Sequence, residues 1–370
     1  MTPIYLDSNA TTEPAPEVLE RMLRVHRDCW GNPGSSHRVG RAARRELETA
    51  REQIADSLDA DPDDVILTSG ATESCNLAIR GLTRGQGTVV SLPGDHPASR
   101  EAIERLPGWS VRDLPVTADG ELGCLDRFDW ESVRLLSMPL AHNETGVVFA
   151  TEEVAAICRE RGIPWHLDAT QAIGRVPVSV ASLGCSALSL SGHKLHGPRG
   201  IGAVVLGRGV TLRGQQVGGH QESGRRAGTE AVALAAGLAE AVVIAVRDQE
   251  SRAGRMRDLR DRFEAAVCGR FDASVNAVSA RRLPNTSSVR FDSVDGEAML
   301  VALDLAGVCA SLGSACASGS PEPSPMLLAM GLSREQAMRS LRFSLSHRTT
   351  AHEIDAAVEA IGRIVGRSVP

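Results

Sequence analysis

The stretch Ser189-Leu190-Ser191-Gly192-His193-Lys194 contains the single lysine of this 370-residue chain, which has 39 arginines. Arginine stays protonated in proteins, whereas a desolvated lysine can lose its proton and then act as a nucleophile or form a Schiff base. A chain that uses arginine for its other strong cations therefore marks Lys194 as a candidate reactive group. The alternative is a chance remnant of an arginine-rich composition.

The residues on either side of Lys194 predict two short buried strands. Alternating apolar residues at 187–190 and an apolar run at 201–206 are typical of strands, and the glycine-rich run 197–202 leads into the second. Lys194 is therefore expected on a tight loop between strands, where proteins often hold functional groups.

Strand-like and helix-like segments alternate upstream of Lys194, after a long amphipathic helix predicted at 38–58. This alternation predicts an α/β fold with a mostly parallel sheet that is covered on both faces. The expected strands are 65–68, 89–92, 133–138 and 165–168, and the expected helices are 72–80, 96–106 and 151–161.

The length of the chain is enough for about two domains. A helix is predicted at 229–246, and a polar, arginine-rich stretch at 247–262 predicts a linking helix. A second, shorter α/β pattern follows from 287 to 365, which predicts a smaller C-terminal domain.

The composition is that of an ordinary globular protein, with 42% hydrophobic and 23% charged residues and a net charge of −6. Such a charge gives no reason to expect a nucleic-acid or membrane partner. No apolar run approaches the roughly 18 residues of a spanning helix, and residues 1–4 lack the features of a signal peptide. These features predict a cytoplasmic protein.

Eight cysteines occur in the chain, and no pair has the Cys-x-x-Cys spacing of zinc or dithiol sites. We therefore predict no metal site and no disulfide scaffold, and we expect most of the cysteines, including Cys309, to be buried in the core. Cys316 is the exception, because it lies in the Gly-, Ser- and Pro-rich segment 311–325, a composition typical of a mobile loop.

Two further motifs suggest a cofactor. Residues 68–74, Thr-Ser-Gly-Ala-Thr-Glu-Ser, join a strand to a helix and can form a phosphate cradle, although a capping box explains the pattern almost as well. Asp168 ends an apolar strand, where it serves as a helix cap or faces a cation. A phosphate cradle, a strand-end acid and a reactive lysine together suggest pyridoxal 5′-phosphate. No P-loop or Gly-x-Gly-x-x-Gly motif is present.

The sequence closely resembles the cysteine desulfurases, pyridoxal-phosphate enzymes of the class-V aminotransferase group. The resemblance spans nearly the whole chain and implies fold type I of the pyridoxal-phosphate-dependent transferases. It also implies a segment 1–14 packed with the small domain, a large cofactor-binding domain at 15–250 and a small domain at 251–370. The matching motifs are Tyr5-Leu6-Asp7, Ala10-Thr11-Thr12, Gly31-Asn32-Pro33, residues 69–74, Asn143-Glu144-Thr145-Gly146, Asp168-Ala169-Thr170-Gln171, residues 191–194, Arg226-Ala227-Gly228-Thr229, Gly313-Ser314-Ala315-Cys316 and Arg342-Phe343-Ser344.

The resemblance implies a role for each candidate residue. Lys194 is implied as the Schiff-base lysine, Asp168 as the partner of the pyridine nitrogen, and Cys316 as the nucleophile that accepts sulfur. Arg342 is implied as the ligand of the substrate carboxylate, a task that its planar fork suits. The resemblance places Gln171 and Asn143 near the ring hydroxyl of the cofactor and His96 on the ring. The residues implied at the phosphate are Ala71, Thr72, Ser191 and His193. Thr229 is implied to reach the phosphate from the second subunit of a homodimer.

The sequence departs from the family pattern at two positions. His142 stands where the family often has a second asparagine before Asn143, and Pro97 follows His96 in an Asp-His-Pro sequence that replaces a more usual Glu-His. Neither departure removes a residue with an implied role. Pro97 is expected to stiffen the turn that holds His96.

The implied reaction converts L-cysteine to L-alanine, with the sulfur passing to Cys316 as a persulfide for an iron–sulfur scaffold or another acceptor protein. Lys194 is expected to move the α-proton, and His96 to handle protons at the substrate thiol. Three alternatives remain open, namely a selenocysteine lyase, another class-V aminotransferase and a non-enzymatic sulfur-binding protein. The sequence names neither the acceptor nor the pathway.

Overall fold

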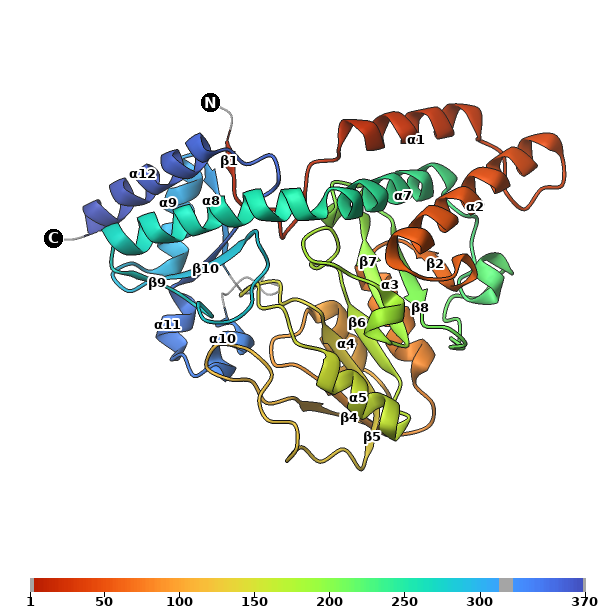
Figure 1. Cartoon of the computed structure of the whole chain (residues 1–370), viewed down its shortest axis with the longest axis horizontal. Coiled ribbons are helices and arrows are strands. Elements are labelled where there is room, and N and C mark those ends of the chain that lie inside the picture. The colour runs from red at the N-terminus through yellow and green to blue at the C-terminus, as the bar shows by residue number, and fades with distance from the viewer. Residues whose placement is uncertain (1–2, 313–321, 369–370) are drawn as a thin grey trace.

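The computed structural model describes residues 3–312 and 322–368. Figure 1 shows a larger lobe built around a central sheet and a smaller lobe that contains the described ends of the chain. The helices α7 (Val232–Arg247) and α8 (Gln249–Arg270) run one after the other across both lobes.

The central sheet of the described chain has seven strands in the order β2-β8-β7-β6-β5-β3-β4. Neighbouring strands are parallel except at β8, which is antiparallel to both β2 and β7. The predicted α/β architecture with a mostly parallel sheet is therefore confirmed. The strands are β2 (Val65–Thr68), β3 (Gly87–Ser91), β4 (Trp109–Asp113), β5 (Val133–Pro139), β6 (Trp165–Asp168), β7 (Ala187–Ser191) and β8 (Gly202–Leu206).

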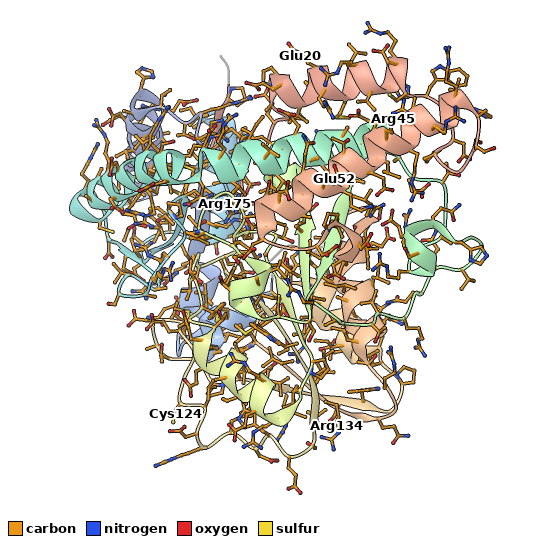
Figure 2. The ribbon with its side chains drawn as sticks, turned by 45° about the vertical axis from the view of Figure 1, so that its right-hand side comes forward. Glu20, Arg45, Glu52, Cys124, Arg134 and Arg175 are labelled. Atoms are coloured by element: carbon orange, nitrogen blue, oxygen red, sulfur yellow. The ribbon has the colours of Figure 1, made fainter. Side chains whose placement is uncertain are left out.

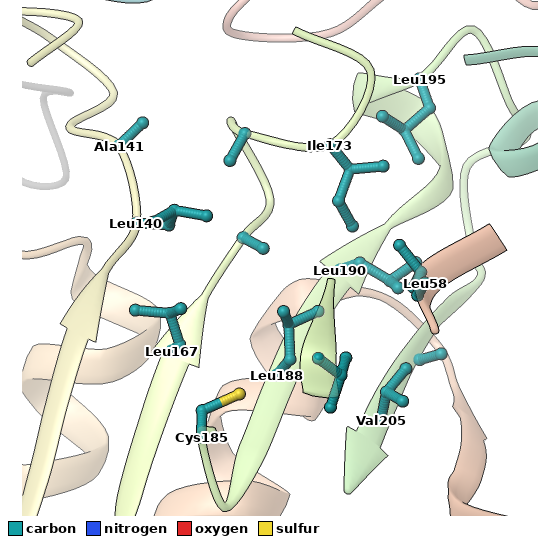
Figure 3. Close-up of a cluster of buried hydrophobic side chains, with 14 of the residues drawn as sticks. Leu58, Leu140, Ala141, Leu167, Ile173, Cys185, Leu188, Leu190, Leu195 and Val205 are labelled. Carbon is teal, nitrogen blue, oxygen red and sulfur yellow. The ribbon is translucent and has the colours of Figure 1, made fainter. Parts of the chain in front are cut away.

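Helices cover both faces of this sheet. On one face α3 (Ala71–Leu82) and α4 (Pro97–Glu104) pack on the sheet, whereas α2 (Arg38–Leu58), α5 (Glu152–Arg161) and α7 cover the other face. Figure 3 shows how Leu167, Leu188 and Val205 from successive strands form an apolar layer with Leu58 of α2. This dry layer anchors the strand ends that carry the polar candidate residues.

Lys194 lies in a short turn between two central strands. The 3₁₀ helix η2 (Gly192–Lys194) follows β7 directly, and the chain returns along β8 in antiparallel register, with Ser191 opposite Gly202. A Cβ atom at Gly202 would lie 2.5 Å from the carbonyl oxygen of Leu190, so this close approach requires glycine. The predicted tight loop is confirmed, and it holds Lys194 at the carboxyl end of β7.

The smaller lobe has its own apolar core. The antiparallel sheet β12-β13-β10-β9 packs on α8, α9 and α12, and the core includes Leu6, Phe263 and Phe343. The strand β1 (Ile4–Tyr5) pairs in parallel with β11 (Val308–Cys309). The other elements are β9 (Ala273–Val275), β10 (Thr286–Phe291), β12 (Ser311–Leu312), β13 (Ser340–Ser344), α9 (Gly296–Leu305) and α12 (Ala351–Ser368).

Parts of the C-terminal third belong to the larger core. Residues 277–283 and 326–337 pack with the helices and strands of the central sheet rather than with the smaller lobe. The remaining elements are α1 (Pro16–Asp28), α6 (Val180–Leu183), α10 (Pro325–Ala329), α11 (Arg334–Met338), η1 (Pro62–Asp64) and η3 (Gln221–Gly224).

Two expectations from the sequence need correction. The helix expected at 229–246 begins at Val232, and the one expected at 247–262 continues to Arg270 because its apolar residues pack in the smaller lobe. The expectation that most cysteines are buried is wrong for the described ones. Cys75, Cys158 and Cys185 are buried, Cys29 and Cys309 are half-buried, and Cys124 and Cys268 lie on an exposed loop and on the outer face of α8.

Candidate active site

A cavity of about 550 Å³ lies at the carboxyl ends of β5, β6 and β7. This is the edge at which open α/β sheets bind ligands. Nine of the residues proposed from the sequence line it, namely Ala71, Thr72, His96, Asn143, Asp168, Gln171, Ser191, His193 and Lys194.

Lys194 points back toward the N-terminal segment of the chain. Its Nζ donates hydrogen bonds to the carbonyl oxygens of Asn9 and Ala10, the latter at 2.7 Å. Burial, with a smaller contribution from the nearby Arg175 and Arg342, lowers the pKa of Lys194 to about 8. The unprotonated fraction of this amine near neutral pH is therefore much larger than that of an ordinary lysine, as a nucleophile or base requires.

Asp168 is the last residue of β6 and is 8% exposed. Its Oδ1 accepts a hydrogen bond of 2.9 Å from the backbone N–H of Thr170, and the Sγ of Cys75 donates to its Oδ2 at 3.7 Å. The sequence left open whether Asp168 serves as a helix cap or faces a cation. It makes a local backbone contact through one oxygen, while the side chain also borders the cavity.

The N-terminus of α3 faces the same cavity without a side-chain cap. Gly70 is the N-cap residue, with φ +149° and ψ 179°, a conformation that other residues rarely adopt. The Glu73 carboxylate, which could cap the helix, instead accepts from the Ser69 N–H and pairs with Arg226 at 2.8 Å. These contacts lower the pKa of Glu73 against the effect of burial. The first N–H groups of α3 are thus left for an anion.

His96 is the N-cap residue of α4. Its Nδ1 accepts a hydrogen bond of 3.1 Å from the Ala98 N–H, so in the neutral ring the proton is on Nε2. His96 lines the cavity, and desolvation by the surrounding protein lowers its pKa. Pro97 occupies the first turn of α4, a favourable position for proline, so this departure stabilises the turn.

His142 supports the loop that carries Asn143. Its ring is fully buried, its Nε2 is 3.1 Å from the Gly94 carbonyl oxygen, and its Nδ1 accepts from the Thr145 N–H at 3.2 Å. Desolvation lowers the pKa of His142 to about 4, so the ring is neutral. The ring therefore ties the loop after β5 to the loop before α4 while Asn143 borders the cavity.

Arg342 lies behind Asn143 and does not line the cavity. Its Nη1 donates to the Asn143 carbonyl oxygen at 3.2 Å, and its Nη2 pairs with the Asp7 carboxylate at 2.8 Å. The Nε atom of Arg342 is buried and has no hydrogen-bond partner among the described residues. One edge of the guanidinium therefore remains available for a further acceptor.

The remaining candidate residues are Thr229 and Cys316. Thr229 is exposed on the segment between η3 and α7 and lies outside the cavity lining. Cys316 lies outside the described residues, which stop at 312 and resume at 322. The roles suggested for both residues remain proposals.

The sequence alone missed several residues of the site. Arg199 lines the cavity, the carbonyl groups of Asn9 and Ala10 hold Lys194, and Arg175 donates to the backbone and side-chain oxygens of Gln171. Backbone carbonyls leave no signal in a sequence. Arg175 lies four residues after Gln171, a spacing that could have indicated contact within one turn.

The described residues contain neither a metal-binding cluster nor a helix that could span a membrane. No group of three His, Cys, Asp or Glu side chains in residues 3–312 and 322–368 could hold a metal ion. None of the described helices combines the length and the apolar character that crossing a membrane would require.

Comparison with known proteins identifies the family. The family model described as aminotransferase class-V matches residues 4–357, so the chain belongs to that family. Within it, the chain belongs to the cysteine desulfurases. It is 41% identical to a cysteine desulfurase of Trichormus azollae and 38% identical to the cysteine desulfurase NifS of Azotobacter vinelandii, each match covering 99% of this chain and 94% of the relative.

Solved structures show the same fold. A NifS-like protein superposes with a TM-score of 0.92 at 32% identity, covering 99% of this chain and all of the other. A NifS-like protein from Rickettsia africae gives a TM-score of 0.88 at 30% identity, covering 98% of this chain and 99% of the other. The fold expected from the sequence is therefore confirmed.

Proposed function

We propose that this protein converts L-cysteine to L-alanine and transfers the sulfur to Cys316 as a persulfide. The observation that supports the proposal most strongly is the convergence of three features in one cavity. These are a lysine with a depressed pKa, a buried strand-end carboxylate and an uncapped helix N-terminus. Together they match the lysine, the acid and the phosphate site that pyridoxal phosphate requires.

The cavity fits that cofactor, on which class-V aminotransferases generally depend. The N-terminus of α3, with Ser191 and His193, would hold the phosphate, Asp168 the ring nitrogen and Lys194 the aldehyde carbon. The buried Thr170 Oγ1 also lines the cavity and has no partner among the described residues, as expected beside a polar ligand. The bound cofactor supplies an electron sink for the bond electrons released at the substrate α-carbon.

Lys194 transfers the proton at the substrate α-carbon. Its pKa of about 8 lets the amine accept a proton near neutral pH and return it later in the reaction. The carbonyl groups of Asn9 and Ala10 hold the amine in one position between these steps. His96, on the cavity wall, takes the proton of the substrate thiol.

Cys316 accepts the sulfur of the substrate. Its thiolate attacks the sulfur of the bound substrate, so that an S–S bond forms while the substrate C–S bond breaks. The electron pair of that bond remains on carbon, which takes up a proton to give alanine. The balance is L-cysteine plus a protein thiol giving L-alanine plus a protein persulfide, with no external oxidant or reductant.

Arg342 is proposed to bind the substrate carboxylate. Its unpartnered Nε offers one donor, and exchange of the Asp7 contact would free Nη2 for the bidentate geometry that carboxylates prefer. Asn143, whose carbonyl oxygen accepts from Arg342, would line the same substrate site.

The functional unit is proposed to be a homodimer that passes sulfur to an acceptor protein, such as an iron–sulfur scaffold. Leu19 and Leu23 lie four residues apart on α1 and are 50% and 70% exposed, and Trp30 just beyond the helix is 74% exposed. Apolar side chains gathered in this way favour a protein contact. Thr229 would then reach the phosphate site of the partner subunit.

One assay separates this function from the alternatives. The purified protein, loaded with pyridoxal phosphate, is given L-cysteine or L-selenocysteine, and alanine, sulfide and selenide are measured. Alanine with matching sulfide from cysteine supports the proposal, and turnover of selenocysteine alone indicates a selenocysteine lyase. Transfer of amino groups without sulfide indicates an aminotransferase, and no turnover of any substrate indicates a binding protein.

The cofactor assignment has its own test. Borohydride reduction of the loaded protein followed by peptide mapping should place the pyridoxyl label on the peptide that contains Lys194. A stably bound cofactor with no label on that peptide would contradict the assignment.

A further inference from the structure

A second, smaller cavity also borders Lys194. Its volume is about 30 Å³, and Lys194 lines both cavities. Ile173 and Leu195, both labelled in Figure 3, form part of its apolar wall. Its polar lining consists of Ser8, Thr12, Arg175, Lys194, His196, Arg252, Ser346 and His347, without any carboxylate.

Arg175 is the unusual member of this lining, because it is a buried cation without a counter-charge. It is 7% exposed, its Nη1 donates to two oxygens of Gln171, and no carboxylate pairs with it among the described residues. Figure 2 labels Arg175 beside the long helical stretch of α7 and α8, where Gln249 donates to the Arg175 carbonyl oxygen. An unpaired buried charge costs several kcal/mol. An anion bound next to Arg175 would therefore stabilise the folded protein.

The other polar groups of the cavity include an unpaired hydroxyl and two histidine rings in contact. The Ser8 Oγ is buried and has no hydrogen-bond partner among the described residues. The ring of His347 packs edge-on against that of His196, with 4.4 Å between the ring centres. The carboxylate of Asp248 next to the cavity is engaged by Arg252 at 2.9 Å.

The two histidines lie near arginines and are neutral near pH 7. Desolvation and the neighbouring Arg252 and Arg348 lower the pKa of His347 to about 3, and desolvation is the main reason that the pKa of His196 falls to about 4. The Nδ1 of His196 lies 2.8 Å from the carbonyl oxygen of Glu13, whose own carboxylate pairs with Arg348. The cavity is thus a positive, partly apolar space with an unpaired hydroxyl.

We propose that this cavity binds a small monovalent anion of halide size, for which chloride is the abundant example. A buried water needs roughly 10–15 Å³ of such volume, so about 30 Å³ accommodates a halide ion but not a phosphate or sulfate. Arg175 supplies the charge, Ser8 supplies a hydroxyl donor, and the apolar wall suits a weakly hydrated ion. The proposal does not depend on the reaction proposed above.

Occupancy of this site acts on Lys194. Arg175 and Arg342 lower the pKa of Lys194, whereas Asp168 and Asp7 raise it. An anion beside Arg175 offsets the first of these influences and stabilises the ammonium form of Lys194. The anion would therefore tune the fraction of lysine free to act as a base.

The first test measures thermal unfolding of the cofactor-loaded protein at constant ionic strength, with chloride replacing gluconate stepwise. Wild type should gain stability along a saturable binding curve. Arg175→Met should lose that dependence and, since it removes a buried unpaired charge, should unfold at a higher temperature than wild type in gluconate. The exposed Arg105→Met is the matched control and should behave as wild type.

The second test locates the ion. Crystals of the loaded protein soaked in sodium bromide should show an anomalous peak between Ser8 and Arg175, and the peak should vanish in Arg175→Met. If that variant does not fold, Ser8→Ala should weaken bromide binding by about tenfold, the value of one lost hydrogen bond to a charged group. Equal stability in chloride and gluconate, or bromide found only in the main cavity or on the surface, would overturn the proposal.

Discussion

Lys194 is a residue whose environment can be measured with unusual clarity, because the chain contains no other lysine. Reductive ¹³C-methylation of the apoprotein labels Lys194 and the N-terminal amine, and NMR titration of the Lys194 signal should give a pKa of about 8. Arg175→Met should raise this pKa because a neighbouring cation is lost, and Asp168→Asn should lower it because an anion is lost. A titration near the ordinary 10.5 would contradict the described burial.

The same shift has a consequence for stability. The folded-state pKa of Lys194 lies below the unfolded one, so between about pH 8 and 10.5 the folded protein binds fewer protons. The destabilisation from this buried charge is therefore fully present below pH 8 and is relieved as the pH rises toward 10.5. Comparison of pH-dependent unfolding with Lys194→Met isolates this contribution.

Asp168→Asn separates the chemical role of the acid from its local backbone contact. Asparagine retains an oxygen that can accept from the Thr170 N–H, so folding should be preserved. Loss of the charge opposite the ring nitrogen should lower kcat by roughly 10²- to 10⁴-fold, the range for a group that controls proton transfer. Steady-state alanine release and thermal unfolding give the two readouts. Unchanged turnover would reduce Asp168 to a helix-capping residue.

Cys316→Ala distinguishes a desulfurase from an aminotransferase. Proton transfer at the α-carbon needs Lys194 and Arg342 but no thiol, so the cofactor absorption change on adding L-cysteine should persist. Alanine release should fall by several orders of magnitude, as it does when a covalent nucleophile is removed. Cys268→Ala, which changes an exposed cysteine of α8, is the matched control. Near wild-type alanine and sulfide from the Cys316 variant would refute the proposed acceptor.

At the scale of single elements, the junction of β2 and α3 depends on Gly70. Alanine at this φ of +149° is strained, at a cost of about 1–3 kcal/mol, and relaxation of the backbone there would reorient the N–H groups at the start of α3. Cofactor affinity in Gly70→Ala should therefore fall by roughly tenfold or more.

The control for that prediction is Gly162→Ala. Gly162 caps α5 with φ +63°, and a Cβ atom added there would meet no other atom within 4 Å, so the variant should lose stability but keep cofactor affinity. Equal affinity loss in both variants, measured by fluorescence titration, would show a general destabilisation rather than a phosphate site.

The bounds of an element were predictable from the sequence where a run or a periodic pattern of apolar residues ended at a polar residue. β2 and β6 have the expected bounds because apolar runs end at Thr68 and Asp168. The start of α7 was misplaced because Thr229 and Glu230 have the composition of a first helical turn, yet the helix begins only at Val232. The contacts of Lys194 with the N-terminal carbonyl groups were not predictable, because they arise from tertiary packing over 184 residues.

At the scale of the whole molecule, the exposed apolar residues of α1 predict self-association. Leu23→Asp places a charge in the proposed subunit contact and should convert a dimer to a monomer, measured by size-exclusion chromatography with light scattering. Cofactor affinity should fall at the same time if Thr229 completes the partner's site. Leu305→Asp, which changes an even more exposed leucine at the end of α9, should leave the dimer intact. If the dimer persists in Leu23→Asp but dissociates in Leu305→Asp, the subunit contact lies on the smaller lobe instead of on α1.

The pairing of β1 with β11 has a consequence for biosynthesis. The N-terminal segment leaves the ribosome first, yet its strand partner at Val308–Cys309 is translated about 300 residues later. Until then, Asn9 and Ala10 are held over Lys194 by contacts with residues translated earlier, such as the Gln171 amide on the Asn9 carbonyl oxygen and the Thr12 hydroxyl on the His193 carbonyl oxygen. A nascent chain that stops before β11 therefore lacks one anchor of the segment that covers its only lysine, and that lysine should react with aldehydes more readily than in the full chain.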